Sequence, residues 1–418
     1  MNKLIVYLNS EKVGFLEQDD SGLMQFTYNQ HWLEKPGAIP LSRSLPLQSK
    51  MFQGKQTRSF FAGILPESQP RRKIAEILGI SAGNDFAMLE MIGGECAGAV
   101  SLLPEGSTPP DSRNAQNREL TELELQQLID ELPNRPLMAG KEGLRLSLAG
   151  AQDKLPIIIH DDRIYLPHGG TPSTHILKPE PDRFPGLVAN EIFCMTLAKT
   201  VGLNTSATEY RQIGGKPCLL VQRYDRINDE NGITTRLHQE DFCQALGFPP
   251  EQKYQAEGGP TIHKCISLLR EWSTAPALDI PNFISGLIFN VLIGNADAHG
   301  KNFSIIYSGG ERRLTPYYDL VSTIAWDNIT KNIAMKIGNS KTVNAFTIGE
   351  WKKMARDAGL GWPMLRERMG EISNRMLLKF GEVETQAKDY SYSMATLLQK
   401  TIEKRAKKML EVLEEQDR

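Results

Sequence analysis

Cysteine is scarce in this sequence, and long apolar runs are missing from it. The five cysteines in 418 residues include no close pair of the kind that binds zinc or carries redox chemistry, so we expect reduced and mostly buried thiols. The N-terminal apolar run, residues 4–8, is too short for a signal peptide, and no later run approaches the length of a membrane span. We therefore expect a cytoplasmic protein with no membrane partner.

An excess of charge of either sign is missing as well. Lysine and arginine number 48 and aspartate and glutamate 50, which gives a formal net charge of −2 and no overall attraction to nucleic acid or anionic lipid. The densest basic group lies near the C-terminus, interleaved with apolar residues at helical spacing, and predicts the solvated face of an amphipathic helix. That group comprises Lys400, Lys404, Arg405, Lys407 and Lys408.

The chain is long enough for two or three packed units, and its composition is that of a folded protein. Its first thirty residues predict a three-stranded meander with a turn at residues 19–22. Residues 104–119 lack apolar periodicity and are rich in proline, serine and asparagine, as is typical of a linker. We therefore predict an N-terminal domain over residues 1–103, and a linker with a connecting helix over residues 104–135.

The rest of the chain predicts a small lobe rich in strands, residues 136–235, and a larger lobe rich in helices, residues 236–418. The small lobe has predicted strands at 155–160, 163–166 and 175–178, a helix at 189–201, and a hairpin of 209–213 with 218–222. In the large lobe, an apolar helix at 282–292 precedes a hairpin of 302–307 with 312–314. This order of elements indicates an α+β fold.

Asp297 and Asn302 lie five residues apart between the apolar helix and the hairpin. That spacing, D-x-x-x-x-N, is typical of kinase catalytic loops, in which the aspartate deprotonates the attacking hydroxyl and the asparagine holds a metal ion. Alone it is weak evidence, because both residues are common in loops. A second carboxylate, Asp319, follows the hairpin, where kinases place a metal-binding aspartate. Two such oxygen ligands, together with the phosphates of ATP, suit Mg²⁺.

A kinase also needs a cation against the α- and β-phosphates of ATP. Lys178 closes an apolar strand and is the best candidate, whereas Glu191, in the next helix, is a weaker candidate for the acid that holds it. Either residue alone could equally be a surface lysine or a glutamate favoured by the helix dipole. The loop 147–154 takes the position of the phosphate-covering loop, although it has Gly150 alone in place of G-x-G-x-x-G. The strand 218–222 lies where the adenine-binding hinge should be, and could equally be a core strand.

Four segments together resemble the HipA family of bacterial serine/threonine kinases, the toxins of HipBA-type toxin–antitoxin modules. They are residues 146–154 (LSLAGAQDK), 174–178 (THILK), 239–244 (QEDFCQ) and 297–304 (DAHGKNFS). The resemblance extends over essentially the whole chain. It implies a two-lobed protein-kinase-like core, related to the phosphoinositide 3/4-kinases, behind a small β-rich N-terminal domain.

The resemblance also implies roles for individual residues. Asp297 would be the catalytic base, Asn302 and Asp319 the Mg²⁺ ligands, and Lys178 the lysine on the ATP phosphates. The other residues that we expect to contact ATP are Ala149, Gly150, Ala151, Gln152, Asp153, Lys154, Gln222, Arg223, Tyr224, His299 and Lys301. Of these, His299 and Lys301 could instead only shape the loop.

The family's autophosphorylation serine corresponds to Ser147. A phosphate there would place nearly two negative charges beside the ATP phosphates, so we expect modification of Ser147 to turn the kinase off. The resemblance further implies a HipB-like helix-turn-helix antitoxin as partner, and contact with operator DNA mainly through that partner. It also implies a translation enzyme, such as an aminoacyl-tRNA synthetase, as the protein substrate.

Two other functions fit parts of the sequence. A small-molecule kinase of the aminoglycoside or sugar type uses a similar Asp/Asn loop, but the N-terminal domain and the Ser147 loop argue against it. A catalytically silent scaffold beside a DNA-binding repressor is the second, and the presence of all the catalytic residue types argues against it. Phosphate transfer to small hydroxylated acceptors would identify the first, and a failure to transfer phosphate from ATP would identify the second.

Overall fold

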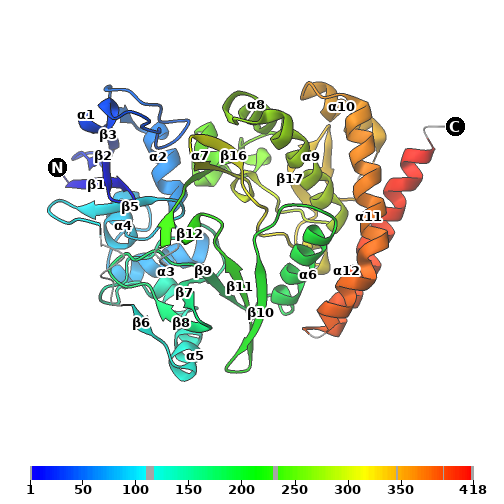
Figure 1. The fold of residues 1–418 in the computed structure, drawn as a ribbon, viewed down its shortest axis with the longest axis horizontal. Helices are drawn as coiled ribbons and strands as arrows, with labels where there is room; N and C mark the ends of the chain where they lie inside the picture. Colours follow the sequence, from blue (N-terminus) through cyan, green and yellow to red (C-terminus); the bar gives the residue numbers. More distant parts are fainter. Residues whose placement is uncertain (1, 110–116, 229–233, 345–346, 389, 416–418) are drawn as a thin grey trace. The chain divides into compact units, whose positions relative to one another are not determined.

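Two compact units make up the chain, which Figure 1 shows as a ribbon. This computed structural model describes residues 2–109, 117–228, 234–344, 347–388 and 390–415. The first unit comprises Met1–Pro179, Arg211–Pro250 and Ile306–Glu311, and the second comprises Glu180–Tyr210, Glu251–Ile305 and Arg312–Arg418. Part of the predicted linker, residues 110–116, lies outside the described residues.

The first unit begins with a five-stranded antiparallel sheet in the order β4-β3-β2-β1-β5, and its first three strands form the predicted meander. The strands are β1 (Asn2–Leu8), β2 (Glu11–Gln18), β3 (Met24–Tyr28), β4 (Phe52–Gln53) and β5 (Val100–Pro104). The turn between β2 and β3 is held by Asp19, whose carboxylate accepts hydrogen bonds from the N–H groups of Ser21 and Leu23. Gly14 lies so close to β3 that a Cβ atom would stand 2.4 Å from the Thr27 carbonyl oxygen.

A six-stranded sheet follows, in the order β10-β11-β9-β7-β8-β6. Its strands are β6 (Arg118–Glu119), β7 (Leu155–His160), β8 (Arg163–Leu166), β9 (His175–Pro179), β10 (Thr208–Ile213) and β11 (Lys216–Gln222), so the predicted strands are present within a few residues. Strand β9 pairs antiparallel with both β7 and β11. Leu155, Leu177 and Leu220 on these three strands belong to the same buried core as β1 and β3. One core therefore supports the N-terminal strands and the strands that carry predicted site residues.

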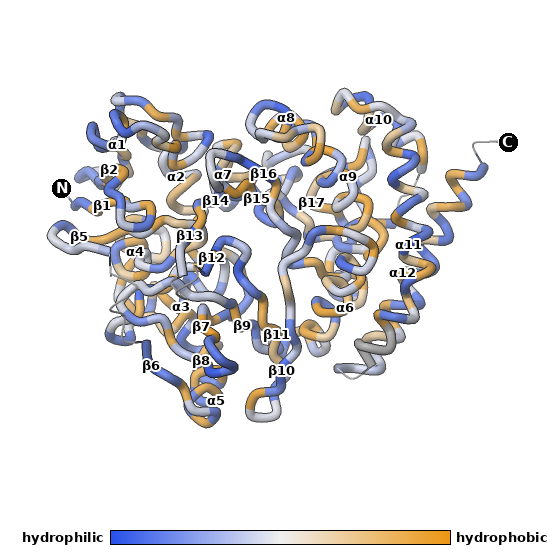
Figure 2. Tube along the Cα trace, in the orientation of Figure 1, coloured by the Kyte–Doolittle hydropathy of each residue, from blue (hydrophilic) through white to orange (hydrophobic). Residues whose placement is uncertain are grey.

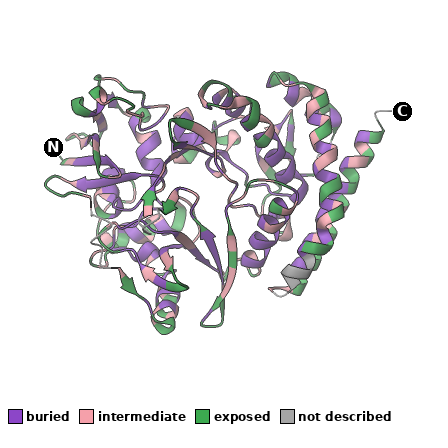
Figure 3. Ribbon diagram, in the orientation of Figure 1, coloured by how far each residue is buried: buried purple, intermediate pink, exposed green. Residues whose placement is uncertain are grey.

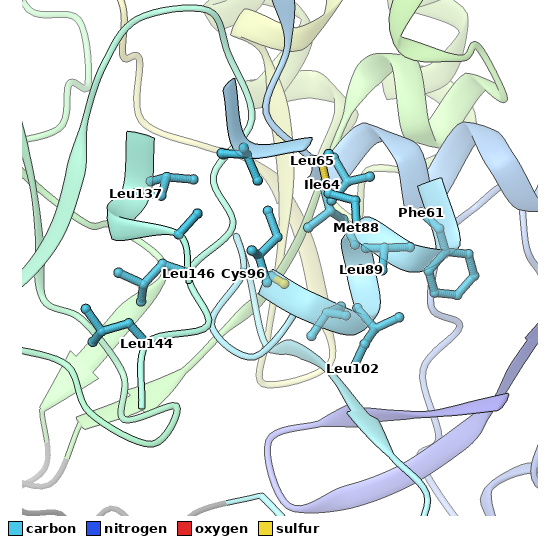
Figure 4. Close-up of a cluster of buried hydrophobic side chains, with 14 of the residues drawn as sticks. Phe61, Ile64, Leu65, Met88, Leu89, Cys96, Leu102, Leu137, Leu144 and Leu146 are labelled. Atoms are coloured by element: carbon cyan, nitrogen blue, oxygen red, sulfur yellow. The ribbon is translucent and has the colours of Figure 1, made fainter. Parts of the chain in front are cut away.

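The remaining elements of the first unit surround this core. The helices are α1 (Gln30–Glu34), α2 (Lys55–Phe61), α3 (Ser68–Leu78), α4 (Asp85–Ile92), α5 (Glu122–Glu131) and α7 (Phe242–Leu246). Strands β12 (Arg226–Asn228) and β13 (Thr234–Arg236) pair, and β14 (His238–Asp241) is an edge strand of a sheet with β15 (Ser304–Ser308) and β16 (Glu311–Leu314). Of β15 and β16, only Ile306–Glu311 belongs to the first unit. Figure 4 shows Leu146, directly before the predicted phosphate loop, in the same buried cluster as Ile64 and Cys96.

The second unit is mainly helical. Its elements are α6 (Leu187–Thr200), α8 (Ile262–Trp272), α9 (Pro276–Ile293), α10 (Ile348–Asp357), α11 (Trp362–Lys388), α12 (Tyr392–Glu414) and the strand pair β17 (Asn332–Ile337) and β18 (Ser340–Thr342). It thus includes α6, which the sequence analysis placed in the small lobe. Among the described helices, α9 alone is long and apolar enough to cross a membrane, and 67% of it is buried inside the fold. Figures 2 and 3 show α9 as mostly hydrophobic and mostly buried, as is typical of a core helix.

The cysteines are in the state that the sequence predicts. All five cysteines are free and buried, as predicted.

Arg405, which we placed on the solvated face of the C-terminal helix, is instead buried in the second unit. Its guanidinium donates hydrogen bonds to the carbonyl oxygens of Val291, at 2.7 Å, and Leu292, at 3.1 Å, at the C-terminal end of α9. Burial lowers the pKa of Arg405 to about 10, so it stays charged at neutral pH and complements the helix dipole.

A buried carboxylate in the first unit, that of Glu240 on β14, joins three segments of the chain. It accepts hydrogen bonds from the hydroxyl groups of Ser42 and Tyr307 and, at 3.0 Å, from the N–H of Arg43. Burial raises the pKa of Glu240 to about 7, although these hydrogen bonds act to lower it. His238, on the same strand, is also buried, and burial lowers its pKa to about 4.

We expect Glu240→Gln to flatten the dependence of stability on pH. An unfolded glutamate titrates at about 4.5, so between about pH 4.5 and pH 7 the folded protein keeps a proton that the unfolded chain has lost. The Glu240 contribution therefore falls as pH rises, by about 3 kcal/mol across that range. Urea unfolding of the wild type and of Glu240→Gln at pH 5, 6, 7 and 8 measures the difference, from which the shared His238 term cancels. The expectation would be contradicted if the unfolding free energies of the wild type and Glu240→Gln changed in parallel with pH. It would also be contradicted if the exposed control Glu76→Gln flattened the pH dependence to the same extent.

Candidate active site

Asp297 lies on the loop that follows α9 in the second unit. The helix ends at Gly294, which adopts a left-handed conformation with φ of 73°. The side chain of Asn295 then accepts the N–H of Asp297 at 3.0 Å and donates to the side chain of Asn290 at 2.8 Å. The Asp297 side chain itself is exposed. A fixed main chain therefore presents the predicted base to solvent.

Asn302 ends a short helical turn, Gly300–Asn302, on the same loop. Its N–H donates to the carbonyl oxygen of His299 at 2.9 Å, and the N–H of His299 donates to the carbonyl oxygen of Asp297 at 2.7 Å. The side-chain oxygen of Asn302 is buried and has no hydrogen-bond partner among the described residues. An unpaired buried acceptor is costly, so this atom fits a ligand that the chain itself does not supply. His299 and Lys301 are buried beside it in the sequence, and their predicted roles stay predictions.

Asp319 is brought to the same loop by its neighbours. The hydroxyl of Tyr318 donates to the carbonyl oxygen of Lys301 at 2.9 Å and lies 2.6 Å from the hydroxyl of Ser304. Thr323, four residues later, accepts the N–H of Ala296 at 2.8 Å. Asp319 has a φ of 54°, a conformation that is uncommon for residues other than glycine and that is found mostly where the surroundings enforce it. The segments of Asp297, Asn302 and Asp319 are therefore joined within one unit.

The donor set at this loop fits Mg²⁺. The described residues contain no group of three His, Cys, Asp or Glu side chains that could hold a metal. The candidate ligands are instead the unpaired amide oxygen of Asn302 and the carboxylate of Asp319. Magnesium is commonly held by one or two protein oxygens, with water and nucleotide phosphates as its other ligands. Bound there, it would neutralise charge on the phosphates during transfer.

Tyr254 is a residue of this site that our sequence analysis did not identify. Its hydroxyl donates a hydrogen bond to Oδ1 of Asp297 at 2.6 Å. Its ring lies edge-on to the ring of His299, with centroids 5.3 Å apart. Because Tyr254 precedes Asp297 by 43 residues, no local spacing pattern could have linked the two.

Ser147 begins the predicted phosphate loop in the first unit, and it is fully buried. Its N–H donates to the carbonyl oxygen of Glu95 at 2.8 Å, and its hydroxyl donates to the carbonyl oxygen of Ile64 at 3.1 Å. The start of the loop is therefore docked against two segments of the N-terminal part of the chain.

The middle of this loop is docked as well. The carbonyl oxygen of Gly150 accepts the N–H of Glu67 at 3.0 Å, and Gly150 has a φ of 111°, which residues with a Cβ rarely adopt. The ammonium of Lys154 folds back onto the carbonyl oxygen of Ala149 at 2.6 Å. The amide nitrogen of Gln152 is buried without a hydrogen-bond partner among the described residues. The loop thus has a defined shape and at least one donor that the described chain leaves unused.

Lys178 and Glu191 fall in different units. Lys178 lies on β9, opposite Leu219 of β11, with its side chain buried in the first unit. Glu191 is buried in α6 of the second unit. Its neighbour Asn190 exchanges two hydrogen bonds with Ser322, three residues after Asp319, at 2.8 and 3.1 Å. The role of Lys178 at ATP stays a prediction.

The side chain of Arg223, directly after β11, forms buried ion pairs, whereas its neighbours Gln222 and Tyr224 are more exposed. Gln222 is exposed and Tyr224 half-buried, with the Tyr224 hydroxyl bonded to Gln239. The guanidinium of Arg223 is buried and donates hydrogen bonds to Asp225 and Glu95, at 2.9 to 3.0 Å. The Arg223 side chain is bound to these carboxylates. We therefore expect only the main chain of Arg223 to contact ATP, and this contact stays a prediction.

Arg223 belongs to a buried ionic cluster that is centred on Glu95. The cluster contains Glu95, Arg223, Asp225, Arg226 and Arg236. Glu95 accepts hydrogen bonds from all three arginines at distances of 2.7 to 3.0 Å. Burial alone would raise the pKa of Glu95, but the arginines outweigh it and lower that pKa to about 2. The cluster therefore remains ionised across the physiological range.

Comparison with known proteins identifies relatives along the whole chain. Residues 4–103 match the family model described as the HipA N-terminal domain, and residues 146–380 match the HipA-like C-terminal domain. A putative kinase of Sinorhizobium fredii, Y4mE, is 45% identical over 372 residues, covering 88% of this chain and 89% of that protein. The serine/threonine-protein kinase toxin HipA of Shewanella oneidensis is 32% identical over 370 residues, covering 85% of this chain and 83% of that protein.

The fold matches a solved structure as well. It is the complex of HipA, HipB and operator DNA from the Shewanella oneidensis toxin–antitoxin system, with a TM-score of 0.87 and 28% identity. The match covers 99% of this chain and 98% of that one. The predicted α+β, kinase-like fold is confirmed.

We expect Asn302→Ala to raise the Mg²⁺ requirement of phosphate transfer. The substitution removes the candidate ligand oxygen, so the Mg²⁺ concentration that gives the half-maximal rate should rise about tenfold or more if this oxygen binds the metal. A titration of the transfer rate against MgCl₂ at fixed ATP measures it. Asn374→Ala, on an exposed face of α11, is the matched control and should behave as the wild type. An unchanged Mg²⁺ dependence in Asn302→Ala would show that this oxygen is not a ligand.

Removal of the Glu95 carboxylate should destabilise the fold strongly. Glu95→Ala would leave Arg223 and Arg226 with Asp225 alone and would remove the Glu95 carboxylate from Arg236. We expect a cost of about 3–5 kcal/mol, the size seen when one partner of a buried ion pair is removed. The control is Glu131→Ala, which breaks half-exposed pairs with Arg135 and Lys141 and should cost about 1 kcal/mol or less. Denaturant unfolding of both variants gives the comparison, and equal losses would refute a special role for Glu95.

Proposed function

This chain belongs to the HipA family of protein kinases, and from that premise we propose that it is a serine/threonine kinase that uses ATP and Mg²⁺, with Asp297 as its catalytic base. The observation that carries the proposal is the joining of three segments, those of Asp297, Asn302 and Asp319, around one rigid loop. The order of these residues and their chemical types match the kinase reaction.

In the proposed mechanism, Asp297 accepts the proton of the attacking hydroxyl group as the hydroxyl oxygen bonds to the γ-phosphorus of ATP. The bond from that phosphorus to the oxygen that bridges the β- and γ-phosphates breaks, and ADP leaves. Asn302 and Asp319 would hold Mg²⁺, which would neutralise charge on the phosphates. Lys178 would face the α- and β-phosphates, and the N–H groups of the loop 149–154 would cover them. Support for the last role comes from the left-handed conformation of Gly150 and from the unused donor of Gln152.

The biological context that we propose is a type II toxin–antitoxin module. The solved relative contains HipA with HipB and operator DNA, which supports a HipB-like antitoxin as the partner of this chain. The net charge of −2 favours contact with DNA mainly through that partner. A cytoplasmic location, expected from the short apolar runs of the sequence, is also part of the proposal. A translation enzyme as substrate, such as an aminoacyl-tRNA synthetase, rests on the family resemblance.

Self-inactivation through Ser147 is the regulatory part of the proposal. The Ser147 hydroxyl is buried and bonded to the main chain of Ile64, so it can reach a γ-phosphate only after the loop leaves its dock. A phosphate group carries nearly two charges at neutral pH and could not return to that buried position without a large desolvation cost. Modification should therefore hold the loop out of the position in which it covers ATP.

We expect the protein to label itself on Ser147 when it is incubated with Mg²⁺ and γ-labelled ATP. Mass spectrometry locates the phosphate, and ATP binding is then measured on the modified and unmodified forms. Asp297→Asn should remove the label while it retains ATP binding, and Ser147→Ala should remove the label while it retains transfer to an added acceptor protein. A protein that is fully phosphorylated on Ser147 and still binds ATP tightly would exclude the self-inactivation. Labelling that survives Asp297→Asn would exclude Asp297 as the base.

A further inference from the structure

We propose that Tyr254 is a positioning residue that holds the carboxylate of Asp297 in its reactive orientation. The inference rests on the proposed role of Asp297 as the base. Its starting point is the hydrogen bond from the Tyr254 hydroxyl to Oδ1 of Asp297, at 2.6 Å. This distance is typical of a hydroxyl donor on a carboxylate, and such charge-assisted bonds are stronger than neutral ones.

The segment that carries Tyr254 is held tightly. The carbonyl oxygen of Tyr254 accepts the N–H groups of Glu257 and Gly259, each at 3.0 Å. A Cβ atom at Gly259 would stand 2.1 Å from the carbonyl oxygen of Gln252, so the turn closes only around glycine. Tyr254 therefore lies in a compact, hydrogen-bonded turn.

Strand β17 forms hydrogen bonds with both this turn and the Asp297 loop. The N–H of Lys336 donates to the side-chain oxygen of Gln255 at 2.7 Å, next to Tyr254. Two residues earlier on the same strand, the N–H of Ala334 donates to the carbonyl oxygen of Ala296 at 2.9 Å, next to Asp297. The residues that follow Tyr254 and precede Asp297 are both bound to β17, so the strand holds the two segments beside each other.

The chemical need for such a contact follows from the exposure of Asp297. An exposed carboxylate rotates about its terminal torsion and is hydrated on both oxygens. A hydrogen bond to Oδ1 fixes that torsion and leaves Oδ2 as the acceptor for the proton of the attacking hydroxyl. Restricting a catalytic group to its reactive geometry lowers the barrier of the chemical step without changing ATP affinity.

The opposite role is conceivable on chemical grounds, because the phenol hydroxyl contacts Asp297 as a substrate hydroxyl would. In that case Tyr254 would block the acceptor position and would have to leave before each transfer. The anchors of the turn on β17 and the packing of the Tyr254 ring against His299 favour a contact that persists. The two roles predict opposite effects of the same substitution.

Tyr254→Phe removes the hydroxyl and keeps the ring. We expect the rate of self-labelling at saturating Mg²⁺ and ATP to fall about tenfold or more, as for loss of a hydrogen bond to a charged group. The ATP concentration for half-maximal rate and the melting temperature should stay as in the wild type. Tyr392→Phe, which removes an exposed hydroxyl on α12, is the matched control and should leave all three quantities unchanged.

The outcomes separate this inference from the proposed function. If Asp297→Asn abolishes labelling and Tyr254→Phe labels at the wild-type rate, Tyr254 has no positioning role and the function stands. A faster rate in Tyr254→Phe would mean that the hydroxyl blocks the acceptor, and equal losses of rate, ATP binding and melting temperature would mean a purely structural role. If Asp297→Asn labels as well as the wild type, Asp297 is not the base, and the inference about Tyr254 falls with it.

Discussion

The buried carboxylate of Glu95 is the contact on which the first unit depends. Its side chain accepts hydrogen bonds from Arg223, Arg226 and Arg236, while its main chain forms hydrogen bonds with Arg145 and Ser147, at the start of the predicted phosphate loop. One residue thus sets the position of the segment after β11 and the start of the loop. Buried ion pairs contribute little to net stability when they are compared with apolar packing, but they allow few alternative arrangements. That property suits a site that must hold its parts in register.

Local sequence patterns were enough to predict most of the elements. The alternating strands and the Asp19 turn gave the N-terminal meander, and the apolar run that ends at Gly294 gave α9. Both signals lie within a few residues, so neither needs knowledge of the tertiary structure. The spacing of Asp297 and Asn302, followed by Asp319, likewise predicted segments that the fold joins at one loop.

What could not be predicted depends on partners far along the chain. Tyr254 contacts Asp297 across 43 residues, and Arg223 contacts Glu95 across 128. Asp225, two residues from Arg223, is its other carboxylate partner, but the sequence gives no sign that both lie in one buried cluster. Arg405 is different, because a signal was present. It stands three residues after Ile402 and four before Met409, on the apolar face of α12, and helical periodicity could have placed it with them. A buried arginine at an apolar position indicates a specific acceptor, here the last carbonyl groups of α9.

The contact of Arg405 with α9 also has a consequence for the order in which the protein takes shape. A ribosome releases Val291 and the loop with Asp297 well before Arg405, which follows Val291 by 114 residues. During that interval the C-terminal end of α9 lacks one of its supports, although every residue of the loop has already been made. This support of the helix that precedes the Asp297 loop is therefore completed late in synthesis. A chain that stops short of residue 405 would carry Asp297, Asn302 and Asp319 but would lack the arginine that binds the C-terminal end of α9.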